Sequence, residues 1–219
     1  MRFGVISDVH ANRVALEAVL EDMPPVEGLV CAGDVVGYNP WPTACVERVR
    51  AESAITIQGN HDRAVAGETP FAFNGMAAAG VEYAREQLGP GELGWLGGLP
   101  TERIIADGRL KVVHGHPDDP DRYTYPKDFA PDLLGEEDVL VMGHTHHQHV
   151  AEFAEGTVLN PGSVGQPRDG DPDAAYAVVD LDEDSVDLHR VSYDVESVIE
   201  AVEAAGLPER IGSRLREGR

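Results

Sequence analysis

Lysine and cysteine are scarce in this sequence of 219 residues, because each occurs only twice. Cys31 and Cys45 stand apart rather than in a CxxC pair. Two separated cysteines exclude a disulfide-built scaffold and a thiolate metal site. We expect both to be small residues of a hydrophobic core.

Long hydrophobic runs are absent as well. No apolar segment approaches the roughly 20 residues that a membrane-spanning helix needs. The opening segment, Met1 to Ser7, is too short for a signal peptide and is predicted to be a first strand. We therefore expect a soluble cytoplasmic protein with no membrane partner.

Positive charge is also sparse. Lysine and arginine together number 17 against 39 aspartates and glutamates, so the formal net charge is −22. Such a surface repels nucleic acids and anionic membranes at long range. An acidic binding face would concentrate its carboxylates, whereas here they are spread along the whole chain. Acidic residues that are spread along the chain, with almost no lysine, indicate adaptation to a high-salt cytoplasm, where salt screens the repulsion between like charges. We therefore interpret the protein as halophilic.

The first third of the chain alternates between strand and helix patterns. Strands are predicted at residues 3–7, 28–32 and 54–57, and amphipathic helices at 12–22 and 42–51. This β-α-β-α-β order implies a parallel sheet with right-handed crossovers.

The rest of the chain contains helices first and then mostly strands. Helices are predicted at residues 76–88, 91–96, 195–205 and 208–215, and strands at 104–105, 110–113, 139–142, 150–153, 158–159, 176–180 and 185–191. Shorter connections between these strands suggest antiparallel pairing. We predict a single α+β domain over residues 1–219 with two facing sheets, and a polar surface loop at 118–131 beside the site.

Five predicted strands share one property, because Asp, Asn or His follows the end of each. These residues are Asp8 and His10, Asp34, Asn60 and His61, His114, and His144 and His146. The carboxyl ends of strands in open α/β sheets converge on one rim, where ligands bind. Eight of the nine histidines lie in or beside these loops, which unrelated loop residues would not explain.

The residue types also serve one chemistry. Imidazole and carboxylate without thiolate favour divalent Mn, Fe, Co, Ni or Zn. One aspartate can bridge two ions, and a neutral asparagine adds an oxygen ligand without further charge. Two ions about 3.5–4 Å apart can hold a hydroxide and a phosphoryl oxygen together for in-line displacement at phosphorus.

The motifs DxH, GDxxG, GNHD, a strand ending in HG, and GHTH follow one another from Asp8 to His146. In this order they resemble the calcineurin-like metallophosphoesterase superfamily. The segment Asn160 to Gly165, NPGSVG, is similar to the one that follows GHTH in small bacterial and archaeal phosphodiesterase-like members. The resemblance extends to the diadenosine-tetraphosphatase-like branch, and it implies an αββα four-layer sandwich of two mixed sheets flanked by helices.

The resemblance also implies roles for the individual residues. Asp8, His10, Asp34 and His146 would bind one metal, and Asp34 would bridge to a second ion that Asn60, His114 and His144 also hold. Two divalent ions are expected, with manganese first. A hydroxide bridging the ions would attack phosphorus, and His61 would be the general acid that protonates the leaving oxygen.

Neighbouring residues have two interpretations each. Asp62 is predicted to be catalytic together with His61. It could orient His61 or a loop amide, or it could cap the following turn. Asn60, Arg63 and Arg168 are candidates for substrate binding, although an exposed arginine is usually only solvated surface.

Three other polar positions are assigned away from the metals. Asn12 is predicted to be a helix N-cap rather than a substrate contact. His116 is expected to support the ligands from behind rather than bind metal. His147 and His149 lie beyond the motif and are expected at the rim or on the surface.

Departures from other members of the superfamily narrow the function. The second motif lacks the Asp-Arg pair of the protein phosphatases, and the third ends in Asp62 rather than glutamate. An acidic chain without room for a DNA-capping domain is not expected to cleave duplex DNA.

We predict a dinuclear phosphoesterase that acts on small phosphoesters, including nucleotide-derived ones. The alternatives are a scaffold or sensor on the same fold, and a mononuclear hydrolase of non-phosphate esters. The loops at 71–76 and 118–131 that would select the substrate carry no recognisable motif.

Overall fold

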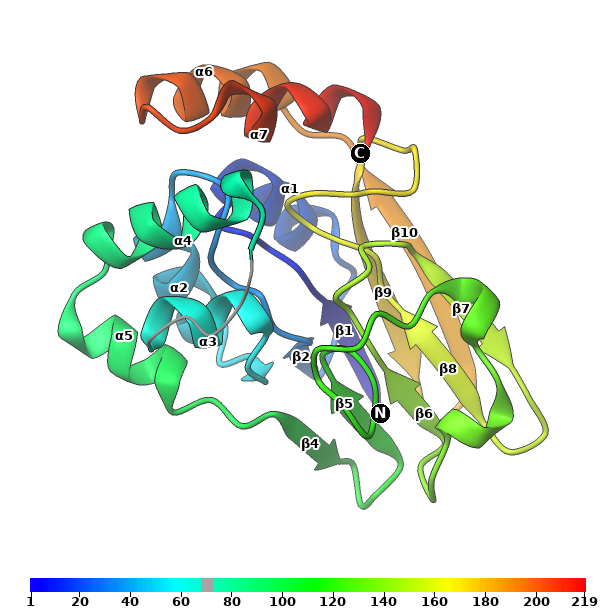
Figure 1. Cartoon of the computed structure of the whole chain (residues 1–219). Helices are drawn as coiled ribbons and strands as arrows, with labels where there is room; N and C mark the ends of the chain where they lie inside the picture. Colours follow the sequence, from blue (N-terminus) through cyan, green and yellow to red (C-terminus); the bar gives the residue numbers. More distant parts are fainter. Residues whose placement is uncertain (68–72) are drawn as a thin grey trace.

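The computed structural model describes residues 1–67 and 73–219. Two five-stranded sheets lie face to face at its centre, with helices outside them (Figure 1). The first has the order β10-β9-β1-β2-β3 and the second β4-β5-β6-β8-β7. The strands are β1 (Arg2–Ile6), β2 (Gly28–Cys31), β3 (Ile55–Thr56), β4 (Glu102–Ile105), β5 (Leu110–Val113), β6 (Val139–Val141), β7 (His149–Glu152), β8 (Thr157–Asn160), β9 (Ala174–Asp180) and β10 (Ser185–Val191). The predicted αββα fold class is confirmed.

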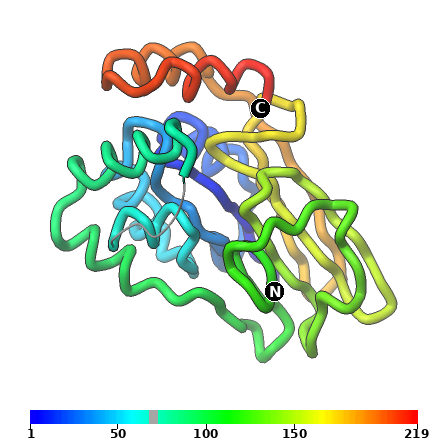
Figure 2. Tube along the Cα trace, in the orientation of Figure 1, coloured from blue at the N-terminus to red at the C-terminus, as the bar shows by residue number. Residues whose placement is uncertain are grey.

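The chain visits the first sheet twice. It leaves that sheet after β3, forms three helices and the second sheet, and returns for β9 and β10 (Figure 2). β1, β2 and β3 pair in parallel, as predicted. β9 then adds to the free edge of β1 in antiparallel orientation.

The two sheets enclose one apolar layer. Val5 and Val30 of the first sheet and Leu110 and Val141 of the second are buried together in it. Ile6, the neighbour of Val5, belongs instead to the outer cluster beneath the helices, because successive strand side chains point to opposite faces. Cys31 and Cys45 are buried in the outer cluster, so their prediction as core residues is confirmed.

The pairing predicted for the second sheet is partly wrong. β4–β5 and β7–β8 are antiparallel, but β5–β6 and β6–β8 are parallel. Parallel neighbours need a crossover of about a dozen residues or more. The segment 114–138 supplies the crossover between β5 and β6, and its short helices η1 (Pro126–Asp128) and η2 (Pro131–Leu133) lie in it. Phe129 and Leu133 from this crossover pack on the outer face of the second sheet.

Among the described residues, five helices cover the outer face of the first sheet. They are α1 (Arg13–Asp22), α2 (Pro42–Ala51), α3 (Asn60–Ala66), α4 (Gly75–Gln87) and α5 (Pro90–Gly97). Four of them match predicted helices, whereas α3 was not predicted. With seven residues, it is too short to show a helical period in the sequence. None of the helices in the described parts of the chain is long and apolar enough to cross a membrane.

The C-terminal segment forms α6 (Val195–Ala204), α7 (Glu209–Ser213) and the 3-10 helix η3 (Arg214–Glu217). Its buried residues Val198, Ile211 and Leu215 pack with Tyr38 and Ala77. Figure 1 shows α6 and α7 above α1 and α4. This packing brings the C-terminal residues next to Tyr38, which lies in the loop after β2.

Candidate metal centre

The strand ends place the predicted ligands at one edge of the two sheets. Asp8 and His10 follow β1, Asp34 follows β2, Asn60 begins α3 after β3, His114 follows β5, and His144 and His146 follow β6. All seven side chains are buried. The structure therefore brings together residues that are up to 138 positions apart in the sequence.

Five of these residues have a left-handed backbone. The φ angles are +52° at Asp8, +47° at His10, +55° at Asp34, +65° at His144 and +62° at His146. Such a conformation costs about 1–3 kcal/mol per residue and persists only where its surroundings enforce it. Hydrogen bonds between the loops do so here, because the N–H groups of Asp8 and His10 donate to the carbonyls of Gly33 and Asp34 at 3.0 and 2.9 Å.

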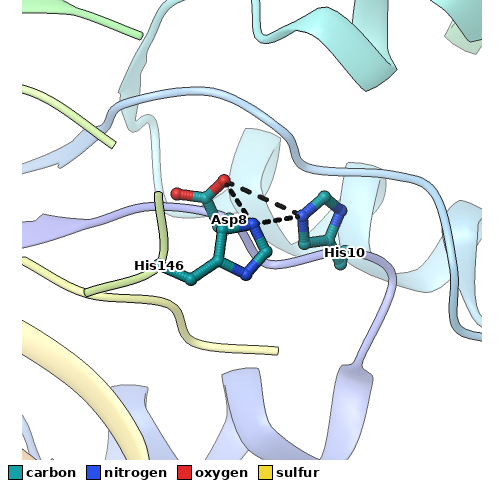
Figure 3. A group of neighbouring side chains, drawn as sticks. All are labelled: Asp8, His10 and His146. Carbon is teal, nitrogen blue, oxygen red and sulfur yellow. Dashed lines mark hydrogen bonds and ion pairs between the residues drawn. The ribbon is translucent and has the colours of Figure 1, made fainter. Parts of the chain in front are cut away.

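Asp8, His10 and His146 form the first cluster (Figure 3). Oδ1 of Asp8 lies 3.2 Å from Nε2 of His146 and 3.7 Å from Nε2 of His10. The other oxygen, Oδ2, already accepts from the Ser7 hydroxyl at 2.6 Å and from the His144 N–H at 3.0 Å. Oδ1 accepts no such hydrogen bond from the described residues, so it is available as a ligand.

The two imidazoles of this cluster face each other. Nε2 of His10 and Nε2 of His146 are 3.1 Å apart. Nδ1 of His10 lies 3.2 Å from the Val36 carbonyl, and Nδ1 of His146 lies 2.6 Å from the Gln166 carbonyl. Carbonyls only accept, so each Nδ1 carries the proton and each neutral ring turns an Nε2 lone pair toward the other. Two opposed lone pairs beside a carboxylate oxygen fit a cation between them.

Asp34, His114 and His144 form the second cluster. Nε2 of His114 lies 3.4 Å from Oδ2 of Asp34 and 3.1 Å from Oδ1 of Asn60. Its Nδ1 donates to the Ala32 carbonyl at 2.7 Å, so this ring also turns Nε2 toward oxygen ligands. Oδ2 of Asp34 also lies 3.7 Å from Nε2 of His10. Asp34 therefore lies between the two clusters.

The charges in the site favour a cation. Burial alone would raise the pKa of Asp8 and of Asp34, but the nearby imidazoles, His146 for Asp8 and His114 for Asp34, hold both below the usual range. Burial lowers the pKa of His114, yet Asp34 raises it to about 10. The carboxylate of Asp34 thus stabilises a positive charge beside it, here the proton on His114. A divalent ion would take the place of that proton, because metal binding requires deprotonated ligands.

His61 occupies the wall of the site. Its ring contacts those of His10, Tyr38 and Phe73, with centroids 4.7–4.8 Å away. Burial lowers the pKa of His61 to about 4. Nδ1 of His61 has no hydrogen-bond partner in the described structure, and a Cβ on Gly37 would lie 2.4 Å from this atom. Glycine at position 37 is therefore needed for the His61 ring to lie there.

Asp62 connects two motif loops. Its carboxylate accepts from the N–H of Val36 at 3.2 Å and from the N–H of Gly59 at 3.1 Å. Of the predicted alternatives, the structure thus shows the contact with loop amides and with the start of α3. Burial, and then the charge of Asp34, raise the pKa of Asp62 to about 7.

The predicted substrate arginines lie in different surroundings. Arg63 forms an ion pair of 2.5 Å with Asp121. Arg168 donates to Oε1 of Gln166 at 2.7 Å and to the Tyr38 hydroxyl at 3.3 Å, and it lines the cavity beside the two clusters.

The remaining predicted polar residues lie outside the ligand clusters. Asn12 caps α1 by accepting from the Ala15 N–H at 3.1 Å, so its prediction as an N-cap is confirmed. Nδ1 of His116 accepts from the Asp118 N–H at 3.1 Å. The half-buried rings of His147 and His149 pack against Tyr125 and Phe129, respectively.

Two segments contact the ligand loops through residues that the sequence analysis does not single out. Asn160 donates to the Gly143 carbonyl and the Thr145 hydroxyl at 2.8 and 3.0 Å, and Ser163 donates to the Asp8 carbonyl at 2.7 Å. Both belong to the NPGSVG segment, whose sequence shows a motif but no role for these two residues. In the loop at 118–131, the Tyr123 ring stacks on His144 with centroids 3.9 Å apart, so its predicted place beside the site is confirmed. Residues 71–72 of the other predicted selecting loop lie outside the described residues.

A cavity of about 800 Å³ opens beside the clusters. Its walls combine predicted site residues, aromatic rings and C-terminal residues. They include Asp34, Tyr38, Asn60, His61, Phe73, Met76, Tyr123, His144, His146, Arg168, Arg210, Arg214, Arg216, Glu217 and Arg219. The four C-terminal arginines were not predicted, although they crowd into the last ten residues of a chain with little positive charge.

Comparison with known proteins extends over the whole chain. Residues 1–184 match the family model for the calcineurin-like phosphoesterase superfamily domain. An uncharacterized protein of Methanocaldococcus jannaschii is 34% identical over 99% of this chain and 98% of its own length. Phosphodiesterase YfcE of Escherichia coli is 28% identical over 83% of this chain and 89% of its own. The crystal structure of a metallophosphoesterase from Sphaerobacter thermophilus has 36% identity and a TM-score of 0.86, and covers 100% of this chain and 99% of that one.

Proposed function

The chain belongs to the calcineurin-like phosphoesterase superfamily and is a metal-dependent phosphoesterase; on this premise we propose that it hydrolyses small phosphoesters at a dinuclear metal centre. The position of Asp34 carries the proposal. Its Oδ2 lies 3.7 Å from Nε2 of His10 and 3.4 Å from Nε2 of His114. A carboxylate that lies between two ligand clusters can bind an ion in each of them and so bridge the two ions.

The donor atoms fit two divalent ions. Asp8, His10, Asp34 and His146 would hold the first, and Asp34, Asn60, His114 and His144 the second. The unpartnered Oδ1 of Asp8 and the opposed Nε2 atoms of His10 and His146 support the first site. The raised pKa of His114 supports the second. Mixed imidazole, carboxylate and amide ligands suit manganese first, with Fe, Ni, Co or Zn as alternatives.

Divalent ions held by these residues would supply a water-derived nucleophile and would neutralise charge on the phosphoryl oxygens. His61 donates a proton to the leaving oxygen, and the negative charge of a bound phosphoester favours the protonated ring. Asp62 is a positioning residue, because it fixes the start of α3 through the Gly59 N–H. Arg168 binds the anionic substrate from the cavity wall.

Small phosphodiesters or phosphomonoesters, including nucleotide-derived ones, are the proposed substrates. The cavity of about 800 Å³ is large enough for such a molecule. The related E. coli protein is named a phosphodiesterase. The net charge of −22 disfavours duplex DNA. We further propose that residues 1–219 form a single domain that works in a high-salt cytoplasm.

The proposal is tested with metal-stripped protein. Mn, Ni, Co, Zn and Mg are added back one at a time in high salt, with bis(p-nitrophenyl) phosphate and p-nitrophenyl phosphate as substrates. We expect turnover to return with manganese at a ratio of two ions per chain. Inactivity with every metal would instead support a scaffold or sensor, and full activity with one bound ion would contradict the dinuclear centre.

A further inference from the structure

Arginine is concentrated in one place in this acidic protein. Of its 17 basic residues, five line the cavity beside the metal centre: Arg168, Arg210, Arg214, Arg216 and Arg219. Among the described residues, only two carboxylate side chains, those of Asp34 and Glu217, line the same cavity. Since Asp34 belongs to the metal clusters, the rest of the wall is strongly positive in a chain of net charge −22.

Among the described residues, three of these arginines have no aspartate or glutamate side chain as a partner. Arg216 pairs with Glu196 at 2.6 Å and Arg219 with Glu217 at 2.9 Å. Within the described parts of the chain, Arg168, Arg210 and Arg214 form no ion pair with an aspartate or glutamate. Burial lowers the pKa of Arg214, and the neighbouring Arg168 and Arg210 lower it further. Positive charges that lie close together with no aspartate or glutamate paired to them favour an anion between them.

The fold holds two of these guanidinium groups in place. Arg168 donates to Gln166 and to the Tyr38 hydroxyl, and its guanidinium lies 5.7 Å from the centre of the Tyr38 ring. Arg214 donates to the main-chain oxygen of Arg219, the last residue of the structure. Leu215, the next residue, is fully buried in the cluster that contains Tyr38. A pre-organised cationic group loses less entropy when it binds an anion.

Tyr38 links this arginine group to the metal centre. Its ring lies 4.8 Å from that of His10 and 4.7 Å from that of His61. The cavity is continuous from His61 and His146 to Arg210 and Arg214. Helices α7 and η3 carry these two arginines and lie beyond residues 1–184, which match the family domain. These arginines therefore lie outside the part of the chain that the family model covers.

We propose that Arg168, Arg210 and Arg214 form a second anion subsite, which binds a phosphate group of the substrate other than the one being hydrolysed. The substrate class is then a small phosphoester with two or more phosphate groups. This inference rests on the proposed function, because the metal centre takes the scissile phosphate. Guanidinium groups suit the second one, since their planar forks bind phosphate through paired, charge-assisted hydrogen bonds. Phe73, Met76 and Tyr123 give the cavity an apolar wall for the organic part.

The test compares two ligands that differ in phosphate number. Binding of AMP and of adenosine 5′-(β,γ-imido)triphosphate is measured by calorimetry on the manganese-loaded protein with manganese in excess. We expect the triphosphate to bind the wild type at least about tenfold more tightly than AMP, a difference of about 1.4 kcal/mol. Arg210→Gln and Arg214→Gln, alone and together, should reduce this preference, to within about threefold for the pair.

Two further variants separate the subsite from general effects of charge and folding. Arg216→Gln removes the same charge from η3 at a residue already paired with Glu196, so it should keep the preference. Arg214→Lys should retain part of it. Equal losses in Arg216→Gln and Arg214→Gln, or no preference in the wild type, would overturn the subsite. Arg210 is exposed, so Arg210→Gln keeps the test valid if Arg214→Gln does not fold.

Hydrolysis of bis(p-nitrophenyl) phosphate by the wild type distinguishes this inference from the proposed function. Turnover without a triphosphate preference would reject the arginine subsite and leave the phosphoesterase. An arginine-dependent preference without turnover would keep the subsite and reject the catalytic proposal.

Discussion

The backbone N–H of His61 donates a hydrogen bond of 2.8 Å to Oδ1 of Asp34. The second oxygen of the same carboxylate faces Nε2 of His114 at 3.4 Å and Nε2 of His10 at 3.7 Å. Asp34 thus fixes the start of α3, and with it His61, while it faces both ligand clusters. We infer that the proposed bridging ligand also sets the distance from the metals to the proposed acid.

Replacing Asp34 tests the bridge. Asp34→Asn keeps an oxygen for the His61 N–H but removes the charge between the clusters. We expect metal content, measured by inductively coupled plasma mass spectrometry, to fall from two ions per chain to one or none, and turnover to fall by orders of magnitude. Asp187→Asn, on an exposed position of β10, is the control. Retention of two ions in Asp34→Asn would show that another group bridges.

Replacing His61 tests proton donation. His61→Asn should lower kcat by about 10²–10⁴-fold for a poor leaving group, because general acids contribute rate enhancements of that size. The loss should be much smaller for p-nitrophenol, which leaves without protonation, than for phenol. Paired phenyl and p-nitrophenyl phosphodiesters measure this difference, and metal content should stay unchanged. His149→Asn is the matched control. Equal losses with both leaving groups would assign His61 a structural or binding role instead.

Asp62 is expected to stabilise the folded protein. Asp62→Ala removes the acceptor of two buried amides, those of Val36 and Gly59. Each unpaired buried N–H costs about 1–3 kcal/mol, so the free energy of unfolding measured in urea should fall by at least that much. Exposed Asp132 provides a control in Asp132→Ala. If Asp62→Ala kept its stability and lost only kcat, a catalytic role for Asp62 would be favoured.

Gly59 allows close contact between two loops. A Cβ at this position would lie 2.1 Å from Oδ1 of Asp34 and 2.3 Å from its backbone nitrogen. Gly59→Ala should therefore displace Asp34, weaken metal binding and destabilise the fold by about 1–3 kcal/mol. Gly75→Ala, whose Cβ would meet nothing within 4 Å, should leave metal affinity unchanged. Equal metal affinity in the two variants would contradict the predicted clash.

Metal binding should raise the melting temperature. The opposed Nε2 atoms of His10 and His146 lie 3.1 Å apart, and a cation between them would relieve their repulsion. A ligand at about 100 times its Kd stabilises the native state by about 2.7 kcal/mol, so manganese should raise the Tm of stripped protein by several degrees. Differential scanning calorimetry measures the shift, which should be smaller in His146→Ala. An unchanged Tm in the wild type would contradict binding between these rings.

Most of the fold prediction came from hydrophobic patterns within short stretches of the sequence. The alternation of strands and helices in the first third gave the parallel sheet, because each strand and its helix lie within a few tens of residues. The pairing of β5, β6 and β8 was missed, since neighbouring strands in a sheet need not be neighbours in the sequence. α3 was missed because its seven residues are too few to show a period.

The sequence by itself determined the chemistry of the site. Asp, Asn and His follow five strands, and strand direction alone sends them to one edge of the sheets. The tertiary structure alone placed Asp34 between the clusters and turned the Nε2 atoms of His10 and His146 toward each other. It also brought Arg210 and Arg214 to the cavity. These relationships depend on loop hydrogen bonds and on packing between segments more than 100 residues apart, and sequence spacing does not encode such distances.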